Sequence, residues 1–130
     1  MAAAHPDGWL VDLADRYYRS LDSHDYDALE SILDPAFVQN RPDRIFEGRD
    51  RFVEFMRDER PDSNTDHRID SYYQHIHTAS TADPPTESMR RLGVLGEVVS
   101  AEGERLFSFV DIHYGDPETH RINELDTFVK

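Results

Sequence analysis

Cysteine is absent from the 130-residue chain, and lysine occurs once, as Lys130. The absence of cysteine excludes disulfides, thiolate metal sites and cysteine nucleophiles. No apolar run approaches the length that spans a membrane, and residues 1–6 lack the basic start and apolar stretch of a secretion signal. We therefore expect a cytoplasmic protein in which residues 1–6 form a flexible N-terminus.

Acidic residues outnumber basic residues by 27 to 14, which gives a net charge of −13. A surface of this sign repels nucleic acid and anionic lipid, so we expect neither nucleic acid nor a membrane as a partner. Asp dominates the acids and Arg the bases. This balance is typical of halophilic proteins, in which molar salt screens the repulsion between like charges. An Arg-favouring genome or an acidic protein from an ordinary cell would give the same composition.

Hydrophobic residues make up 38% of the chain and aromatic residues 11%, which is enough for a packed core. The length predicts one domain over residues 1–130. A first helix is expected after Asp7, a second after the capping residue Asp25, and a third over residues 50–60. The first helix has apolar positions at helical spacing: Leu10, Leu13, Tyr17 and Leu21.

The second half of the chain predicts long strands joined by turns. These strands are expected at residues 67–78, 90–100, 105–114 and 120–129, after a short strand at 36–40. Residues 79–87 contain two adjacent prolines and are expected to form a mobile loop. Three helices followed by a meander of strands predict an α+β fold, with the helices on one face of an antiparallel sheet.

Five segments occur in a recognisable order: Arg16-Tyr17, residues 21–26, residues 34–38, Gly48 and residues 121–129. Together they resemble the nuclear transport factor 2-like superfamily, which includes SnoaL-like polyketide cyclases and ketosteroid isomerases. The resemblance implies a cone-shaped α+β barrel, in which three N-terminal helices pack on a strongly curved antiparallel sheet. It also implies a mostly apolar pocket between the helices and the sheet. Because this fold hosts isomerases, dehydratases, cyclases and binding domains, it does not fix the reaction.

Steroid isomerisation is the first reaction of the superfamily that can be compared with the residues of this chain. It requires a carboxylate base and an oxyanion hole made by a tyrosine and a protonated aspartate. Ungapped matching places the tyrosine on Tyr17, the base on Asn40 and the aspartate near Val110. An amide cannot serve as the base and valine cannot donate a proton, so only Tyr17 fits. The alternative for Tyr17 is a buried aromatic residue with a satisfied hydroxyl.

Dehydration is the second chemistry. Dehydratases of the superfamily use a histidine on the strand after the third helix, oriented by an aspartate in the first helix. The matching positions are His67 and Asp12, and a His–Asp pair is a sound general base because the carboxylate fixes the tautomer. Asp12, however, lies roughly 145° around the helix from the apolar stripe, at 100° per residue. This position favours the alternative, a solvent-facing Asp12 paired with Arg16 and an exposed His67.

Histidines and arginines offer two further candidate sites. His75 and His77 share one strand face, but His113 is expected roughly 10 Å away, which favours solvent-facing side chains over a metal site. Four arginines cluster near the expected pocket mouth: Arg41, Arg44, Arg49 and Arg51. They could attract a carboxylate-bearing ligand, although pairing with the acids beside them is the simpler expectation.

The sequence thus predicts a small-molecule-binding domain of SnoaL-like fold, with lyase or isomerase chemistry as an option, and without metal or cofactor. The expected ligand is a small apolar or aromatic molecule. Its binding residues are expected to be Tyr17, Asn40, Phe55, Val110 and Tyr114, with Asp12 and His67 as the catalytic pair. A non-catalytic dimerisation or partner-binding domain of the same fold is the alternative.

Residues 105–114 predict the two faces of the sheet. Placing Val110 in the pocket directs Leu106, Ser108, Ile112 and Tyr114 toward the helices as well, because side chains alternate along a strand. Phe107, Phe109, Asp111 and His113 would then face outward. Two outward phenylalanines would form an apolar patch on an acidic surface, so we expect a homodimer through the outer face of the sheet.

Overall fold

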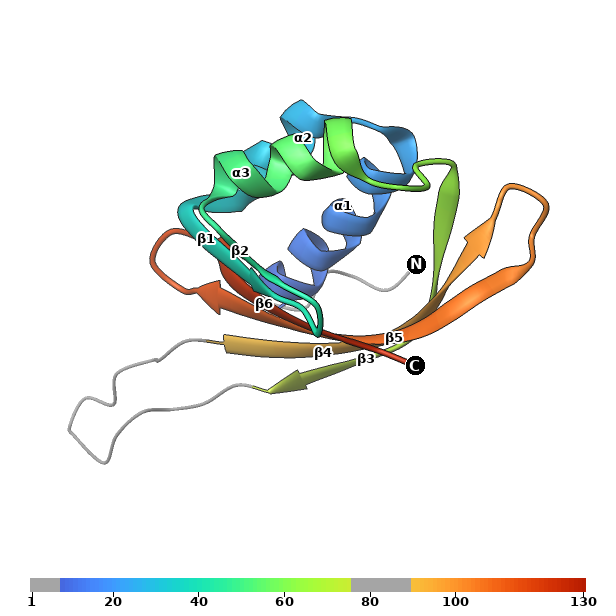
Figure 1. Cartoon of the computed structure of the whole chain (residues 1–130). Helices are drawn as coiled ribbons and strands as arrows, with labels where there is room; N and C mark the ends of the chain where they lie inside the picture. The colour runs from blue at the N-terminus through green and yellow to red at the C-terminus, as the bar shows by residue number, and fades with distance from the viewer. Residues whose placement is uncertain (1–7, 76–89) are drawn as a thin grey trace.

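Three helices lie on one face of a curved sheet in the computed structural model, which describes residues 8–75 and 90–130 (Figure 1). The elements, in chain order, are α1 (Trp9–Ser23), α2 (Tyr26–Ile32), β1 (Leu33–Asn40), β2 (Ile45–Glu47), α3 (Arg49–Glu54), the π-helical turn η1 (Phe55–Glu59), β3 (Thr65–His75), β4 (Arg90–Ser100), β5 (Arg105–Asp116) and β6 (Arg121–Val129). This arrangement confirms the expected α+β fold. The expected flexible N-terminus and the loop at 79–87 lie outside the described residues.

The sheet has six strands in the order β2-β1-β6-β5-β4-β3. Every neighbouring pair is antiparallel except β1 and β6, which run parallel. The two end strands, β2 and β3, do not pair with each other, so the sheet of the expected cone-shaped fold is open and not closed into a barrel, and it contains one parallel pair. The open sheet curves around the helices and leaves its other face without a covering helix among the described elements (Figure 1).

The helices follow the expected local signals. In α1, Leu10, Leu13, Tyr17 and Leu21 are all buried. The Asp25 side chain caps α2 by accepting a hydrogen bond from the backbone N–H of Ala28 at 3.1 Å, which satisfies an otherwise unpaired donor. The expected third helix divides into α3 and η1. Within the described residues, no helix is long and apolar enough to cross a membrane.

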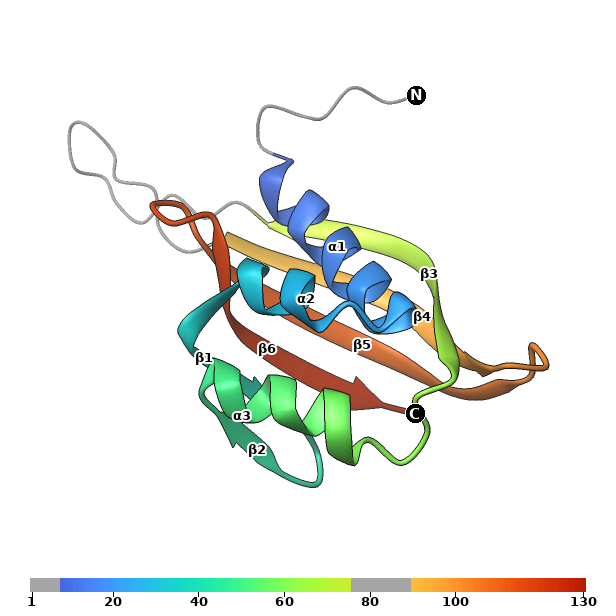
Figure 2. The same ribbon diagram turned by 90° about the horizontal axis from the view of Figure 1, so that it is seen from above.

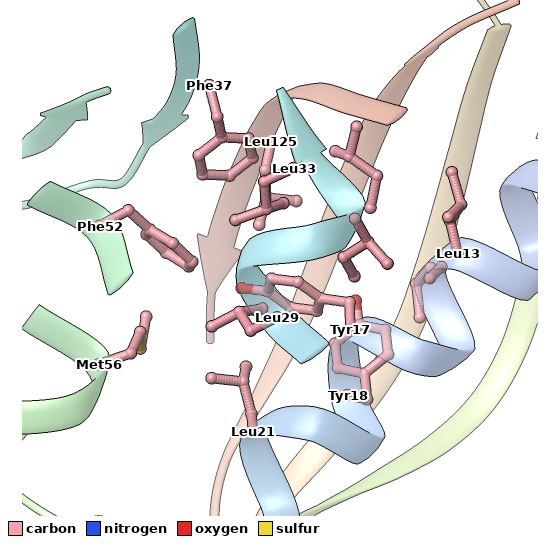
Figure 3. Packing of buried hydrophobic residues seen from close by; sticks show 14 of the residues in the cluster. Leu13, Tyr17, Tyr18, Leu21, Leu29, Leu33, Phe37, Phe52, Met56 and Leu125 are labelled. Carbon is pink, nitrogen blue, oxygen red and sulfur yellow. The ribbon is translucent and has the colours of Figure 1, made fainter. Parts of the chain in front are cut away.

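The core lies between α1, α2, α3 and the inner face of the sheet. Figure 2 shows from above how the helices lie over the sheet, and Figure 3 shows the packing of the buried side chains. Phe52 of α3 is fully buried and packs edge-to-face on Phe37 of β1, with ring centroids 4.9 Å apart. Its ring also lies 6.2 Å from that of Tyr17, which joins α1 to the same cluster. Aromatic pairs of this geometry stabilise a core beyond the area that they bury.

The side chains of β5 from Phe109 to His113 point to the opposite faces of the sheet from those expected. Asp111 and His113 are buried and pair across to the buried residues Val94 and Leu92 of β4. Val110, by contrast, is 37% exposed on the outer face. The expectation that Val110 faces the helices is therefore wrong, and with it the outward placement of Phe109, Asp111 and His113. A slip of one residue in the match turns every side chain of a strand to the other face.

Candidate functional site

A cavity of about 270 Å³ lies between the helices and the inner face of the sheet. Its apolar wall includes Leu21, Phe55, Met56, Val98 and Phe109. The polar groups that line it include Tyr17, Gln39, Arg41, Arg60, His67, Asp111 and Thr127. The volume is just below the range of about 300–1,000 Å³ that holds drug-sized ligands, so the cavity suits a smaller molecule.

His67, the third residue of β3, is held by Asp22 at the C-terminal end of α1. The Asp22 carboxylate lies 2.6 Å from the ring Nδ1 of His67 and also accepts a hydrogen bond from the backbone N–H of His67 at 3.0 Å. Because the carboxylate only accepts hydrogen bonds, this contact assigns the proton to Nδ1 and leaves the lone pair on Nε2. Within the described residues, Nε2 has no hydrogen-bond partner.

Asp111 of β5 is the buried carboxyl group of the cavity. Its Oδ2 accepts a hydrogen bond from the Tyr18 hydroxyl at 2.7 Å, and its Oδ1 accepts one from the Thr127 hydroxyl at 2.7 Å. Burial raises the pKa of Asp111, an effect that these hydrogen bonds, the positive charge of Arg41 and the charge that His67 carries when protonated oppose. Desolvation thus favours the protonated form, which can donate a proton inside the cavity.

His113 extends this network away from the cavity. Its Nε2 lies 2.9 Å from the Tyr18 hydroxyl, and its Nδ1 is buried without a hydrogen-bond partner. Burial lowers the pKa of His113 to about 3, so the ring is neutral near pH 7. Tyr18 therefore lies between the carboxyl group of Asp111, to which its hydroxyl donates, and the neutral imidazole of His113.

Two of the expected ligand-binding residues line the cavity: Tyr17 and Phe55. Three do not. The Asn40 amide donates to Glu124 and Asp126 at 2.7 Å each, and the Tyr114 hydroxyl donates to Asp126 at 2.8 Å, all on the outer face of the sheet. The expectations for Asn40, Tyr114 and Val110 are therefore wrong, and Gln39 occupies the inward position next to Asn40.

One residue of the expected catalytic pair, Asp12, does not contact His67. His67 lines the cavity, but Asp12 is exposed, and the carboxylate that His67 contacts is Asp22. Asp12 lies near the N-terminal end of α1, whereas β3 begins beside its C-terminal end, so only Asp22 reaches the start of β3. The alternative of an exposed His67 is wrong as well, because its side chain is 13% exposed.

The two remaining candidate sites were the histidines and the cluster of four arginines. His113 is fully buried, which overturns its expected solvent-facing position, and His77 lies outside the described residues. Residues 8–75 and 90–130 contain no group of three or more potential metal ligands. Of the four arginines expected at the pocket mouth, only Arg41 lines the cavity. The simpler expectation holds for them, since Arg41 and Arg44 pair with Asp43, Arg49 with Glu30 and Asp50, and Arg51 with Glu54 and Glu59.

Sequence reasoning missed Asp22, Gln39, Arg60 and Asp111. The signal for Asp111 was present, because the protonated aspartate of the ketosteroid isomerases had been matched one residue away, on Val110. With Asp111 inside, that chemistry still lacks its base, since both Gln39 and Asn40 are amides. The other three residues had no separate signal in the sequence.

Solved structures of low sequence identity share this fold. The CaMKII hub of S. rosetta matches with a TM-score of 0.72 at 13% identity, covering 99% of this chain and 100% of that one. The orange carotenoid protein of Anabaena (Nostoc) sp. PCC 7120, solved with canthaxanthin, matches with a TM-score of 0.69 at 16% identity, covering 88% of this chain and 34% of that one. A protein from Agrobacterium tumefaciens, provisionally described as an isomerase of the SnoaL-like family, matches with a TM-score of 0.64 at 13% identity, covering 94% and 97%.

The family assignment comes from the sequence itself. No curated protein matches the chain at a significant level. A family model does match, and it spans residues 14–124, from the middle of α1 to the first half of β6. That span contains the His67–Asp22 pair, Asp111 and most of the cavity wall. The chain therefore belongs to the SnoaL-like domain family.

Proposed function

We propose that the cavity binds a small apolar or aromatic molecule and catalyses proton transfer on it, as a lyase or an isomerase. The observation that carries the proposal is the 2.6 Å contact between Asp22 and Nδ1 of His67, in a histidine that lines an apolar cavity. The second polar group, Asp111, lines the same cavity and contacts Tyr18, whose ring centroid lies 5.2 Å from that of His67. A base with a free lone pair and a carboxyl group whose pKa is raised by burial are the two partners of acid–base catalysis.

Elimination of water from a β-hydroxy ketone illustrates the chemistry. Nε2 of His67 takes the proton from the carbon next to the carbonyl, and the electron pair of that C–H bond forms the new double bond. The C–O bond to the hydroxyl breaks, and Asp111 gives its proton to the departing oxygen, so that water leaves. Asp22 stabilises the imidazolium, and the released water carries the proton from His67 back to the Asp111 carboxylate.

The experiment uses the aldol of benzaldehyde and acetone, whose dehydration to the conjugated enone is followed by ultraviolet absorbance. We expect His67→Gln and Asp111→Asn to lower kcat/KM by about 100-fold or more, in the range of lost general acid–base catalysis. Asp22→Asn should also lower it, because it removes the group that fixes the tautomer. Asp12→Asn is the matched control on the same helix and should have no effect.

Two results would contradict this proposal. A wild-type rate no faster than that of the His67→Gln variant would exclude the catalytic role of this residue. A rate unchanged by Asp22→Asn would show that the Asp22–His67 contact is only structural, since a base oriented by a carboxylate depends on it.

The outer face of the sheet supports a second role in assembly. Val110 pairs with Leu95 on β4 and with Phe128 on β6, and Phe128 and Tyr73 are 54% and 62% exposed. We define Tyr73, Leu95, Val110 and Phe128 as the outer apolar patch. It replaces the expected patch of Phe107 and Phe109, and it favours a homodimer through this face because a soluble, acidic protein rarely exposes such a surface.

Light scattering tests the dimer in molar KCl. We expect the mass of two chains for the wild type and for Phe128→Leu, and the mass of one chain for Phe128→Asp, which places a charge within the outer apolar patch of each chain. A wild-type mass of one chain at all protein concentrations would exclude a stable dimer. The cavity lies on the opposite face, so the proposed chemistry does not depend on this outcome.

A further inference from the structure

Arg41 and Arg60 bring two positive charges to a cavity wall that is otherwise mostly apolar. Other arginines nearby are arranged differently. Arg44 and Arg57 pair with exposed acids and do not line the cavity. In a chain of net charge −13, with an abundance of acids to neutralise them, two cationic side chains on one cavity wall require a physical reason.

Arg60 gives the strongest indication that the cavity binds an anion. Its Nε is buried without a hydrogen-bond partner, and Nη2 donates one bond, to the Tyr26 hydroxyl at 3.3 Å. No acid among the described residues forms an ion pair with it. A buried charged donor without an acceptor is costly, and an anionic occupant of the cavity would satisfy it.

Arg41 is held by aromatic rings rather than by a buried acid. Its guanidinium carbon lies 5.7 Å from the ring centroid of Phe55 and 5.9 Å from that of Phe46. Its one ion pair within residues 8–75 and 90–130 joins Nε to Asp43 at 3.3 Å, and the Asp43 side chain is 53% exposed. Exposed pairs are worth only about 0–1 kcal/mol, so Asp43 does not prevent Arg41 from binding a better-placed anion.

Tyr17 lines the same cavity as the two arginines. Its hydroxyl has no hydrogen bond within the described residues. Burial raises the pKa of Tyr17 well above its usual value, and Asp111 raises it further, while the positive charges of Arg41 and Arg60 oppose both effects. The phenol therefore stays protonated near pH 7. The cavity lining thus includes a neutral O–H donor and two cationic donors, and no carboxylate of the described residues pairs with Arg60.

We infer that the ligand of the cavity carries a carboxylate, which binds Arg60, Arg41 and Tyr17 while its apolar body extends along Phe55 and Phe109. The inference rests on the proposed function, because it names the ligand class of the same cavity. A carboxylate fits better than a phosphate for electrostatic reasons. Asp62 also lines the cavity, and the net charge is −13, so a dianion would meet stronger repulsion than a monoanion.

Isothermal titration of matched ligand pairs tests the inference. The pairs are benzoate and benzamide, cinnamate and cinnamamide, and naphthoate and naphthamide, which differ in charge but hardly in shape. We expect the best carboxylate to bind about 10-fold or more tightly than its amide, the effect of one charge-assisted hydrogen bond. Arg60→Gln and Arg41→Gln should remove this preference and leave amide binding unchanged.

Arg44→Gln is the control for Arg41→Gln, because Arg44 shares its partner Asp43 and the rings of Phe46 and Phe55 but does not line the cavity. Arg57→Gln is the control for Arg60→Gln. Equal binding of carboxylate and amide by the wild type would overturn the inference and leave the proposed function intact. Failure of all six molecules to bind would contradict the proposed function, and the inference with it.

Discussion

Gly96 in β4 is the position at which the smallest substitution should have the largest effect. A Cβ atom there would lie 2.6 Å from the backbone oxygen of Arg68 and 2.9 Å from Cζ of Phe109. The oxygen belongs to the β3–β4 pairing beside an irregularity after Ile69. The Phe109 ring is confined by Tyr18 and His67, with centroids 5.7 Å away in each case. Neither neighbour can move freely.

Gly93 in the same strand provides the matched control. A Cβ atom there would lie 3.7 Å from the backbone oxygen of Tyr73 and 3.8 Å from its Cβ, which is ordinary contact. Both glycine-to-alanine substitutions remove the same conformational entropy from the unfolded chain, so their difference isolates the steric clash. Overpacking of this kind costs about 2–3 kcal/mol. For a domain of this size, that corresponds to a difference of roughly 10 °C in Tm.

Thermal unfolding followed by far-ultraviolet circular dichroism measures this difference, in molar KCl for all three proteins. We expect Gly93→Ala to melt at or above the wild-type temperature and Gly96→Ala well below it. Gly96→Ala should also weaken the binding of aromatic probes, because relief of the clash moves Phe109 within the cavity wall. Equal melting temperatures for the two variants would refute the packing argument at Gly96.

Three further predictions concern charge. The raised pKa of Asp111 stabilises the fold below the unfolded pKa, and this contribution is lost as the pH rises through the folded pKa. In urea titrations, Asp111→Asn should therefore gain stability relative to the wild type as the pH rises. The lowered pKa of His113, about 3, stabilises the fold above the unfolded pKa near 6.5, and the contribution is lost as the pH falls. His113→Gln should thus flatten the loss of stability between about pH 7 and pH 3, where the pH dependence from His113 is on the order of several kcal/mol. The net charge of −13 predicts that the wild-type Tm rises from about 0.1 M to about 2 M KCl, and an unchanged Tm would contradict the halophile interpretation.

The fold could be predicted from local signals because those signals agree with the tertiary structure. The apolar spacing of α1, the cap at Asp25 and the limits of β4 are all confirmed by the structure. Each depends on interactions within a few residues or within one strand. The parallel pairing of β1 with β6 could not be found in this way, because it joins strands about 80 residues apart in the chain.

The candidate site could not be predicted so well, because β5 carries apolar residues on both of its faces. Val110 and Ile112 alternate with Phe109 and with two polar residues, so polarity alone directs Asp111 and His113 toward solvent. The structure reverses this because Tyr18 and Thr127 satisfy the Asp111 carboxyl group from other elements. A buried polar group is determined by its hydrogen-bond partners, and alternation along one strand does not contain that information.

The choice between Asp12 and Asp22 shows the same limit on a helix. At 100° per residue, Asp22 lies roughly 135° from the centre of the apolar stripe, almost as far as Asp12. Periodicity therefore places both carboxylates on the solvent-exposed face of α1 and cannot distinguish Asp12 from Asp22. The difference is tertiary: the chain returns from η1 into β3 beside the end of α1, where the backbone N–H of His67 donates to Asp22. The proposed catalytic pair of Asp22 and His67 joins the end of a helix to the start of an edge strand. An unfavourable helical angle does not exclude such a pair, because neither side chain has to lie beneath the helix.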